Sequence, residues 1–340
     1  MNRKKFMGSL IGLGSIPHIP HRSMENAVEE RPMIIPPSLK PGAWIGVTSP
    51  AGYITLEEAA PAIEQMKSWG YRIRIGTTIG RRFFGFGGTD DERRADLQRM
   101  MDDPQLSAIM CARGGYGIIR IIDQLDFSGL VRNPKWIIGF SDITVLHSHL
   151  HTNYGIASIH SKMCNSFPDK WELADELQKA TITSIRVALS GKSATISALP
   201  SSYNRMGTAE GLLIGGNLKT IESLAGSASD LDTRGKILFV EDTGEYLYSI
   251  DRMFWNLKRT GKLDGLAALI VGGFKIKPDD PGEEFGIALQ NIILSKINEY
   301  AYPVSFDFPV GHQKNNFALK CGVRHRLMNT GLNCTLQELL

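Results

Sequence analysis

The stretch that decides the fold is Lys135-Trp136-Ile137-Ile138-Gly139-Phe140-Ser141-Asp142. After Lys135, residues 136–139 form a compact apolar run, which is typical of a strand buried on both faces of a parallel sheet. A short turn follows, and residues 143–151 then show helical spacing. A strand that turns directly into a helix predicts a parallel α/β sheet with functional loops at the carboxyl ends of its strands.

The flanking sequence repeats this alternation of apolar strands and amphipathic helices. Strands are expected at 44–48, 71–75, 106–111, 236–240, 266–271 and 303–308, and helices at 57–69, 90–101, 118–125, 250–258 and 285–300. The fold class is therefore α/β, with one strand-and-helix unit before residue 170 and another after residue 207.

The length of 340 residues is suited to two domains. We expect an amino-terminal α/β domain at 43–170 and a carboxyl-terminal domain at 207–340. The stretch 171–206 is rich in Ser, Ala and Thr and is expected to connect them, and the proline-containing stretch 25–42 is expected to be a linker.

Charge argues against a nucleic-acid partner. The formal net charge is +3, and Arg3, Lys4, Lys5 and Arg22 precede residue 25, where no acid occurs. The remainder of the chain therefore carries a formal charge of −1, and it shows no basic patch.

Residues 1–24 predict an export signal, because a positive start is followed by a short apolar segment at 6–16. The alternative is a basic tail on a cytoplasmic protein, since no A-x-A cleavage site is visible. The apolar segment is too short to span a bilayer, and no later run is long and apolar enough for an integral membrane segment.

Metal ligands are not expected. His147, His149 and His151 could bind zinc as H-x-H pairs, but they follow the turn at Ser141 in a stretch with helical spacing and no clear carboxylate ligand nearby. The four cysteines stand singly and are expected to be small core residues: Cys111, Cys164, Cys321 and Cys334. We therefore predict neither a metal nor another cofactor.

Ser141 is a candidate nucleophile, because a serine on a sharp strand-to-helix turn projects its hydroxyl from the sheet edge. Ile143 replaces the second glycine of the usual G-x-S-x-G pattern, so the turn alone is also compatible with a helix cap. A serine nucleophile needs a base and an orienting carboxylate. His312 and Glu241 each follow an apolar strand, although a surface histidine and a salt-bridged glutamate are the alternatives.

Several motifs together resemble the LD-carboxypeptidase family, which includes muramoyl-tetrapeptide carboxypeptidases and microcin-immunity hydrolases. They occur in family order: Val47-Thr48-Ser49-Pro50-Ala51-Gly52, Ala112-Arg113-Gly114-Gly115-Tyr116-Gly117, Gly139-Phe140-Ser141-Asp142, Gly215-Gly216-Asn217-Leu218, Val240-Glu241-Asp242 and Gly311-His312. The resemblance spans about residues 40–328. Ile118 departs from the small residue that many members carry there, and we expect only a packing difference.

The resemblance implies a catalytic triad of Ser141, Glu241 and His312. It also implies a Rossmann-like amino-terminal domain, a smaller swivelling β/α carboxyl-terminal domain and a homodimer.

In the mechanism we expect, the backbone N–H groups of Asp142 and Gly115 hold the oxyanion. Arg113 either pairs with the substrate carboxylate or forms an interior ion pair.

The leading hypothesis is an exported serine carboxypeptidase that removes terminal D-alanine from murein tetrapeptides. The alternatives are a microcin-immunity-type hydrolase of peptide–nucleotide conjugates, a non-catalytic peptidoglycan-binding module, and a metal-dependent hydrolase that uses the three histidines. The sequence does not indicate whether the third peptide residue is lysine or diaminopimelate.

Overall fold

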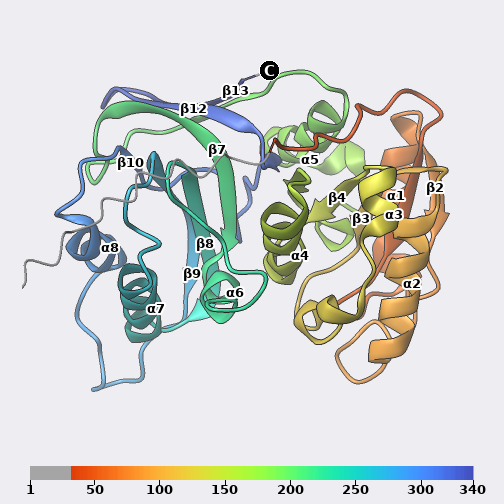
Figure 1. Cartoon of the computed structure of the whole chain (residues 1–340), viewed down its shortest axis with the longest axis horizontal. Coiled ribbons are helices and arrows are strands. Elements are labelled where there is room, and N and C mark those ends of the chain that lie inside the picture. The colour runs from red at the N-terminus through yellow and green to blue at the C-terminus, as the bar shows by residue number, and fades with distance from the viewer. Residues whose placement is uncertain (1–31, 340) are drawn as a thin grey trace, which may run out of the picture. The chain divides into compact units, whose positions relative to one another are not determined.

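Two β-sheets organise residues 32–339, which are the residues that this computed structural model describes (Figure 1). The predicted export signal at 1–24 lies outside the described residues, as does the first part of the predicted linker. The α/β fold class is confirmed: a mostly parallel sheet is followed by a second sheet with its own helices.

The first sheet has the strand order β11-β5-β4-β3-β1-β2. Its members are β1 (Trp44–Thr48), β2 (Arg72–Ile75), β3 (Leu106–Cys111), β4 (Trp136–Gly139), β5 (Ser158–His160) and β11 (Leu319–Cys321). The first five are parallel, and β11 pairs antiparallel with β5. Trp136–Gly139 is buried at every position, as its unbroken apolar run predicts.

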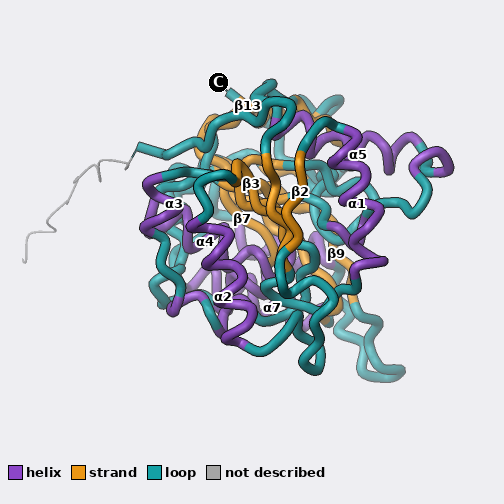
Figure 2. The backbone as a smooth tube through the Cα atoms, turned by 90° about the vertical axis from the view of Figure 1, so that its right-hand side faces the viewer, coloured by secondary structure: helices purple, strands orange, loops and turns teal. Residues whose placement is uncertain are grey.

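Helices cover both faces of this sheet: α1 (Leu56–Ser68), α2 (Asp90–Asp102), α3 (Ser128–Arg132), α4 (Thr144–His149) and α5 (Glu176–Leu189). Figure 2 shows α1 and α5 on one side of the strands and α2, α3 and α4 on the other. Alternate residues of β4 serve the two faces, since Ile138 packs with α1 and α5 and Ile137 packs with α2 and α3. α1 and α2 each begin with a capping box, from Thr55 and Thr89.

The second sheet has the order β10-β9-β8-β7-β12-β13-β6. Its strands are β6 (Thr195–Ala198), β7 (Gly207–Asn217), β8 (Ile237–Glu245), β9 (Ala268–Ile276), β10 (Val304–Ser305), β12 (Arg324–Asn329) and β13 (Cys334–Glu338). The strands β7 to β10 are parallel, and the other three pair antiparallel. Its helices are α6 (Leu218–Ser223), α7 (Leu247–Arg259) and α8 (Leu289–Ile297).

Some elements differ from the sequence prediction. The stretch 118–125 forms two 3₁₀ turns, Ile118–Arg120 and Ile122–Gln124, instead of one helix. The segment 171–206 contains α5 and β6, and β11 returns to the first sheet from the carboxyl-terminal half of the chain. The predicted domain limits remain a prediction. Across residues 32–339, every helix is too short or too polar to cross a bilayer.

The three alternating histidines contribute to packing. His147 is 2% exposed; its Nε2 lies 2.9 Å from the Gly139 carbonyl oxygen, and its Nδ1 lies 2.8 Å from Ser158 Oγ. Because a carbonyl oxygen can only accept, Nε2 carries the proton. His149 Nδ1 is hydrogen-bonded to Ser229 Oγ at 2.8 Å. In the described part of the chain, no three His, Cys, Asp or Glu side chains are grouped to hold a metal ion, and the four cysteines are buried and free.

These buried histidines predict that the protein loses stability in acid. Burial lowers the pKa of His147, His151 and His325 to about 4. In an unfolded chain, the pKa of histidine is about 6.5. Unfolding therefore takes up protons below that pH, so stability that is present above pH 6.5 is lost as the pH falls toward 4.

His147→Gln should reduce this loss, because glutamine can still donate to the Gly139 carbonyl but does not titrate. One pKa unit corresponds to about 1.4 kcal/mol, so His147 accounts for up to about 3 kcal/mol. The measurement is the free energy of unfolding in urea at pH 7 and pH 4 for both proteins. Buried acids with raised pKa values act in the opposite direction but are common to both. An identical acid loss in the two proteins would contradict the assignment.

Candidate active site

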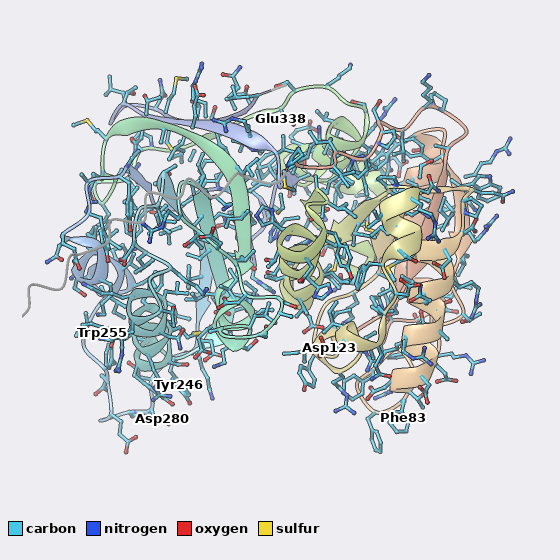
Figure 3. The ribbon with its side chains drawn as sticks, viewed as in Figure 1. Phe83, Asp123, Tyr246, Trp255, Asp280 and Glu338 are labelled. Atoms are coloured by element: carbon cyan, nitrogen blue, oxygen red, sulfur yellow. The ribbon has the colours of Figure 1, made fainter. Side chains whose placement is uncertain are left out.

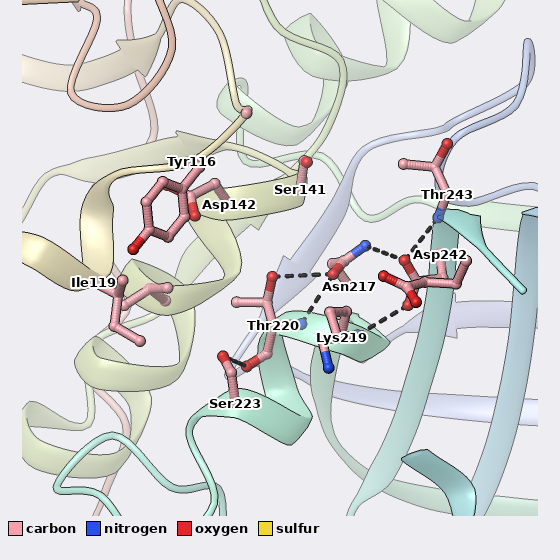
Figure 4. Close-up of a pocket in the computed structure, with 13 residues that line it drawn as sticks. Tyr116, Ile119, Ser141, Asp142, Asn217, Lys219, Thr220, Ser223, Asp242 and Thr243 are labelled. Carbon is pink, nitrogen blue, oxygen red and sulfur yellow. Dashed lines mark hydrogen bonds between the residues drawn. The ribbon is translucent and has the colours of Figure 1, made fainter. Parts of the chain in front are cut away.

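Ser141 occupies the turn between β4 and α4 in a left-handed backbone conformation, with φ of 63°. Such a conformation costs a non-glycine residue roughly 1–3 kcal/mol and recurs at functional sites. The loop of Gly114 and Gly115 passes close by, since a Cβ at Gly114 would lie 2.9 Å from Ser141 Cβ. Ser141 lines a cavity of about 460 Å³ with Tyr116, Asp142 and residues from the second sheet (Figure 4).

Glu241 and His312 form a direct pair in the second sheet. Glu241 lies in β8 with 0% of its surface exposed. His312 Nδ1 lies 2.5 Å from Glu241 Oε2, and the His312 backbone N–H donates to the same oxygen at 3.1 Å. Because the carboxylate accepts this hydrogen bond, the neutral ring carries its proton on Nδ1, and Nε2 is the nitrogen that can accept a proton. Gly311 makes the approach possible, because a Cβ there would lie 2.4 Å from Glu241 Cβ.

The neighbouring carboxylates do not face the imidazole. Asp242 Oδ1 accepts from Asn217 Nδ2 at 3.0 Å, and Glu245 Oε2 accepts from Ser249 Oγ at 2.6 Å. Burial raises the pKa of Asp242 to about 6, and the nearby Glu241 carboxylate contributes. Glu241 is therefore the carboxylate that can orient His312.

Contacts from β7 and from His312 join the two halves of the site. Asn217 N donates to Thr144 Oγ1 at 3.0 Å, and Gly216 has φ of 144° where a Cβ would lie 2.4 Å from that oxygen. The Phe140 ring lies 4.8 Å from the His312 ring, centroid to centroid. Within residues 32–339, no hydrogen bond joins Ser141 Oγ to His312. The three residues predicted for the triad therefore lie in one region, where Glu241 and His312 are bonded to each other but Ser141 is not bonded to His312.

Two of the other predicted site residues lie at the cavity that Ser141 lines. Gly115 and Asp142 line the same cavity. Asp142 Oδ2 accepts from the Ile118 N–H at 2.8 Å, and burial raises its pKa to about 6. Arg113 is exposed and donates to the Tyr53 carbonyl at 3.1 Å. It forms no ion pair with any described residue, so its guanidinium is available to a ligand.

Lys162 is a residue near the site that the sequence pattern did not indicate. It follows β5 and is partly buried, and its Nζ donates to the Gln313 carbonyl at 2.6 Å, one residue beyond His312. The same Nζ lies 5.8 Å from the Phe140 ring centroid. Burial lowers the pKa of Lys162, and the Glu241 carboxylate acts in the opposite direction. Its position after a parallel strand is the signal that could have found it.

Comparison with known proteins agrees with this architecture. The models of the LD-carboxypeptidase amino-terminal and carboxyl-terminal domains match residues 45–161 and 210–327. The probable murein peptide carboxypeptidase of Bacillus subtilis (strain 168) is 32% identical over 297 residues, which cover 87% of this chain and 91% of the relative. The Escherichia coli microcin C7 self-immunity protein MccF is 26% identical over 275 residues, 72% of this chain and 79% of that protein.

A solved structure shares both the fold and the sequence pattern. The crystal structure of muramoyltetrapeptide carboxypeptidase from Oxalobacter formigenes superposes with a TM-score of 0.75 and 29% identity, covering 87% of this chain and 98% of that one. The family models and these similarities agree over both sheets. The chain therefore belongs to the LD-carboxypeptidase family and is a serine-type peptidase.

Proposed function

We propose that the protein is a serine carboxypeptidase that hydrolyses the L,D-amide bond before the terminal D-alanine of murein tetrapeptides, with Ser141, His312 and Glu241 as its triad. The observation that supports this most is the buried Glu241–His312 pair beside the strained turn at Ser141. The names of the similar carboxypeptidases support the substrate.

In the proposed reaction, His312 Nε2 takes the proton of Ser141 Oγ as that oxygen attacks the carbonyl carbon before D-alanine. Glu241 stabilises the imidazolium that results. The imidazolium then protonates the leaving nitrogen, D-alanine departs, and an ester remains on Ser141. Water, activated by His312, hydrolyses this ester and restores the serine.

The oxyanion of the tetrahedral intermediate would accept hydrogen bonds from the backbone N–H groups of Asp142 and Gly115, which border the cavity at Ser141. Arg113 would pair with the carboxylate of the terminal D-alanine, since its planar guanidinium suits a carboxylate and has no ionic partner in residues 32–339. A hydrogen bond between Ser141 and His312 needs about 2.6–3.2 Å, so we infer that the two sheets approach each other when substrate binds.

A second candidate is hydrolysis of peptide–nucleotide conjugates. The similarity to the microcin C7 self-immunity protein favours it, and the exposed ring of Tyr116 on the rim of the cavity could support a base. The same mechanism would apply to either substrate. We further propose that residues 1–24 export the protein to the compartment of the murein, and that it acts as a homodimer.

The first test is mass spectrometry of purified tetrapeptides and of an aminoacyl sulfamoyl adenosine after incubation with the protein. Loss of D-alanine from the tetrapeptide is the expected result, and cleavage of only the nucleotide conjugate would favour the second candidate.

Ser141→Ala and Ser141→Gly should both abolish turnover. Ser141→Gly should unfold at no lower temperature than wild type, because glycine adopts a positive φ without strain. Turnover near wild type in either variant would contradict the nucleophile assignment.

Glu241→Gln should lower kcat by about 10³-fold or more, because the amide cannot stabilise the imidazolium. The matched control is Glu338→Gln, which removes another buried, paired carboxylate: Glu338 lies in β13 and bonds Lys320 Nζ at 2.6 Å (Figure 3). The control should lose stability but keep its kcat. Equal kcat losses in both folded variants would mean that Glu241 has only a structural role.

Activity should survive exhaustive treatment with EDTA, because the proposed reaction uses only protein groups. Two of the three histidines of the competing zinc mechanism are engaged in hydrogen bonds: His147 with Gly139 and Ser158, and His149 with Ser229. The measurement is the rate of D-alanine release before and after chelation. A loss that added zinc restores would instead support the metal-dependent hydrolase.

A further inference from the structure

The loop that carries His312 turns sharply at the residues on either side of it. The Gln313 N–H donates to the Gly311 carbonyl at 2.8 Å, which closes the turn around the histidine. Gly311 has φ of 102°, a left-handed conformation that a glycine adopts more readily than any residue with a Cβ. Because Gly311 precedes His312, its orientation decides whether the His312 backbone N–H reaches the Glu241 carboxylate.

The side chain of Asn316 bonds this turn. Asn316 is 0% exposed, and its Oδ1 accepts from the Gly311 N–H at 2.8 Å. The next N–H along the chain, that of His312, donates to Glu241 Oε2 at 3.1 Å. Two successive backbone N–H groups are thus directed to two different side chains. Since a buried N–H without an acceptor is costly, the Asn316 bond favours the orientation of Gly311 in which both donors are satisfied.

The nitrogen of the Asn316 amide does not hold another part of the fold. Nδ2 is buried without a hydrogen-bond partner in residues 32–339, and so are both ring nitrogens of the neighbouring His160. Burial, the larger effect, holds the pKa of His160 well below its usual range, and the Asn316 side chain acts in the opposite direction, although the two side chains fall short of a hydrogen bond. A buried donor without a partner costs free energy, which a leucine would avoid. The bond to Gly311 is therefore the contact for which an asparagine is needed here.

We propose that Asn316 is a positioning residue for the hydrolysis, an inference that rests on the proposed function. Its Oδ1 fixes Gly311, so that His312 keeps both bonds to Glu241 and its Nε2 remains free to accept the serine proton. Without this acceptor, Gly311 has the freedom to turn its N–H elsewhere, and the imidazole is correctly oriented for a smaller fraction of the time. Because Asn316 is fully buried and does not line the cavity at Ser141, the loss falls on kcat rather than on KM.

Three substitutions of Asn316 test this role. Asn316→Leu and Asn316→Ala remove the acceptor, with and without filling its space, whereas Asn316→Asp keeps an oxygen that can accept from Gly311 whether or not the carboxyl is ionised. The leucine and alanine variants should lower kcat for D-alanine release by about 10- to 100-fold, as expected when a catalytic group is misplaced, and should change KM by about twofold or less. Asn316→Asp should retain several-fold more kcat than Asn316→Leu.

The matched control is Asn329→Leu. Asn329 is another buried asparagine whose Oδ1 accepts from a glycine N–H, that of Gly331, at 3.3 Å. Its Nδ2 also donates to the Val304 carbonyl at 3.0 Å, so this side chain joins two strands of the second sheet. Asn329→Leu should lower the temperature of thermal unfolding more than Asn316→Leu does, but it should keep the wild-type kcat at a temperature at which it is folded.

A second readout needs no substrate. The proton on His312 Nδ1 lies in a short hydrogen bond to Glu241, with 2.5 Å between the heavy atoms, so its NMR signal should lie far downfield. This signal should weaken in Asn316→Leu, as exchange with water becomes faster, and should persist in Asn329→Leu.

A kcat near that of wild type in any folded variant without the acceptor would overturn the inference. Equal kcat values for Asn316→Asp and Asn316→Leu would also overturn it, because the accepting oxygen would then be irrelevant. Absence of D-alanine release by the wild-type protein would instead overturn the proposed function, and the NMR signal would still decide whether Asn316 orients the imidazole.

Discussion

The carboxylate of Glu241 is buried in β8, and a buried charge is tolerated only when it is paired and hydrogen-bonded. His312 supplies two bonds to Oε2 of this carboxylate, one from its ring and one from its backbone N–H. These bonds require the loop to pass directly over the carboxylate, and Gly311 has no Cβ that would prevent this. The burial of the Glu241 charge thus constrains the loop that carries His312. It also fixes the imidazole proton on Nδ1, so that Nε2 is the nitrogen left to accept a proton.

The opposite half of the site depends on a second close approach. Ser141 adopts a positive φ at the end of β4. Thr144, three residues after Ser141, lies against Gly216 of β7, where a Cβ would clash with the threonine side chain. The bond from Asn217 N to Thr144 Oγ1 joins the helix behind Ser141 to the strand next to β8. The helix behind Ser141 is therefore joined to β7, the neighbour of the Glu241 strand, by a hydrogen bond from a backbone N–H to a side-chain hydroxyl.

Much of this arrangement is visible in the sequence because it is local. The apolar run of β4 predicts a buried strand, and a glutamate directly after such a run predicts a paired carboxylate. Contacts between distant segments are not encoded in local periodicity. No local pattern indicates that β11 returns to β5, or that Lys162 Nζ reaches the Gln313 carbonyl. The family resemblance supplied the pairing of Glu241 with His312, which the residues alone left open.

Lys162 links the segment after β5 to the loop that carries His312. Its ammonium is held by the Gln313 carbonyl and lies within electrostatic reach of Glu241, whose negative charge offsets part of the cost of burying it. The hydrogen bond to the Gln313 carbonyl and the nearby Glu241 carboxylate both favour the charged form of Lys162. Since Gln313 adjoins His312, this ammonium helps to fix the loop that carries the imidazole. A neutral side chain at position 162 would leave the Gln313 carbonyl without this donor, and the loop would then depend on the bonds between His312 and Glu241.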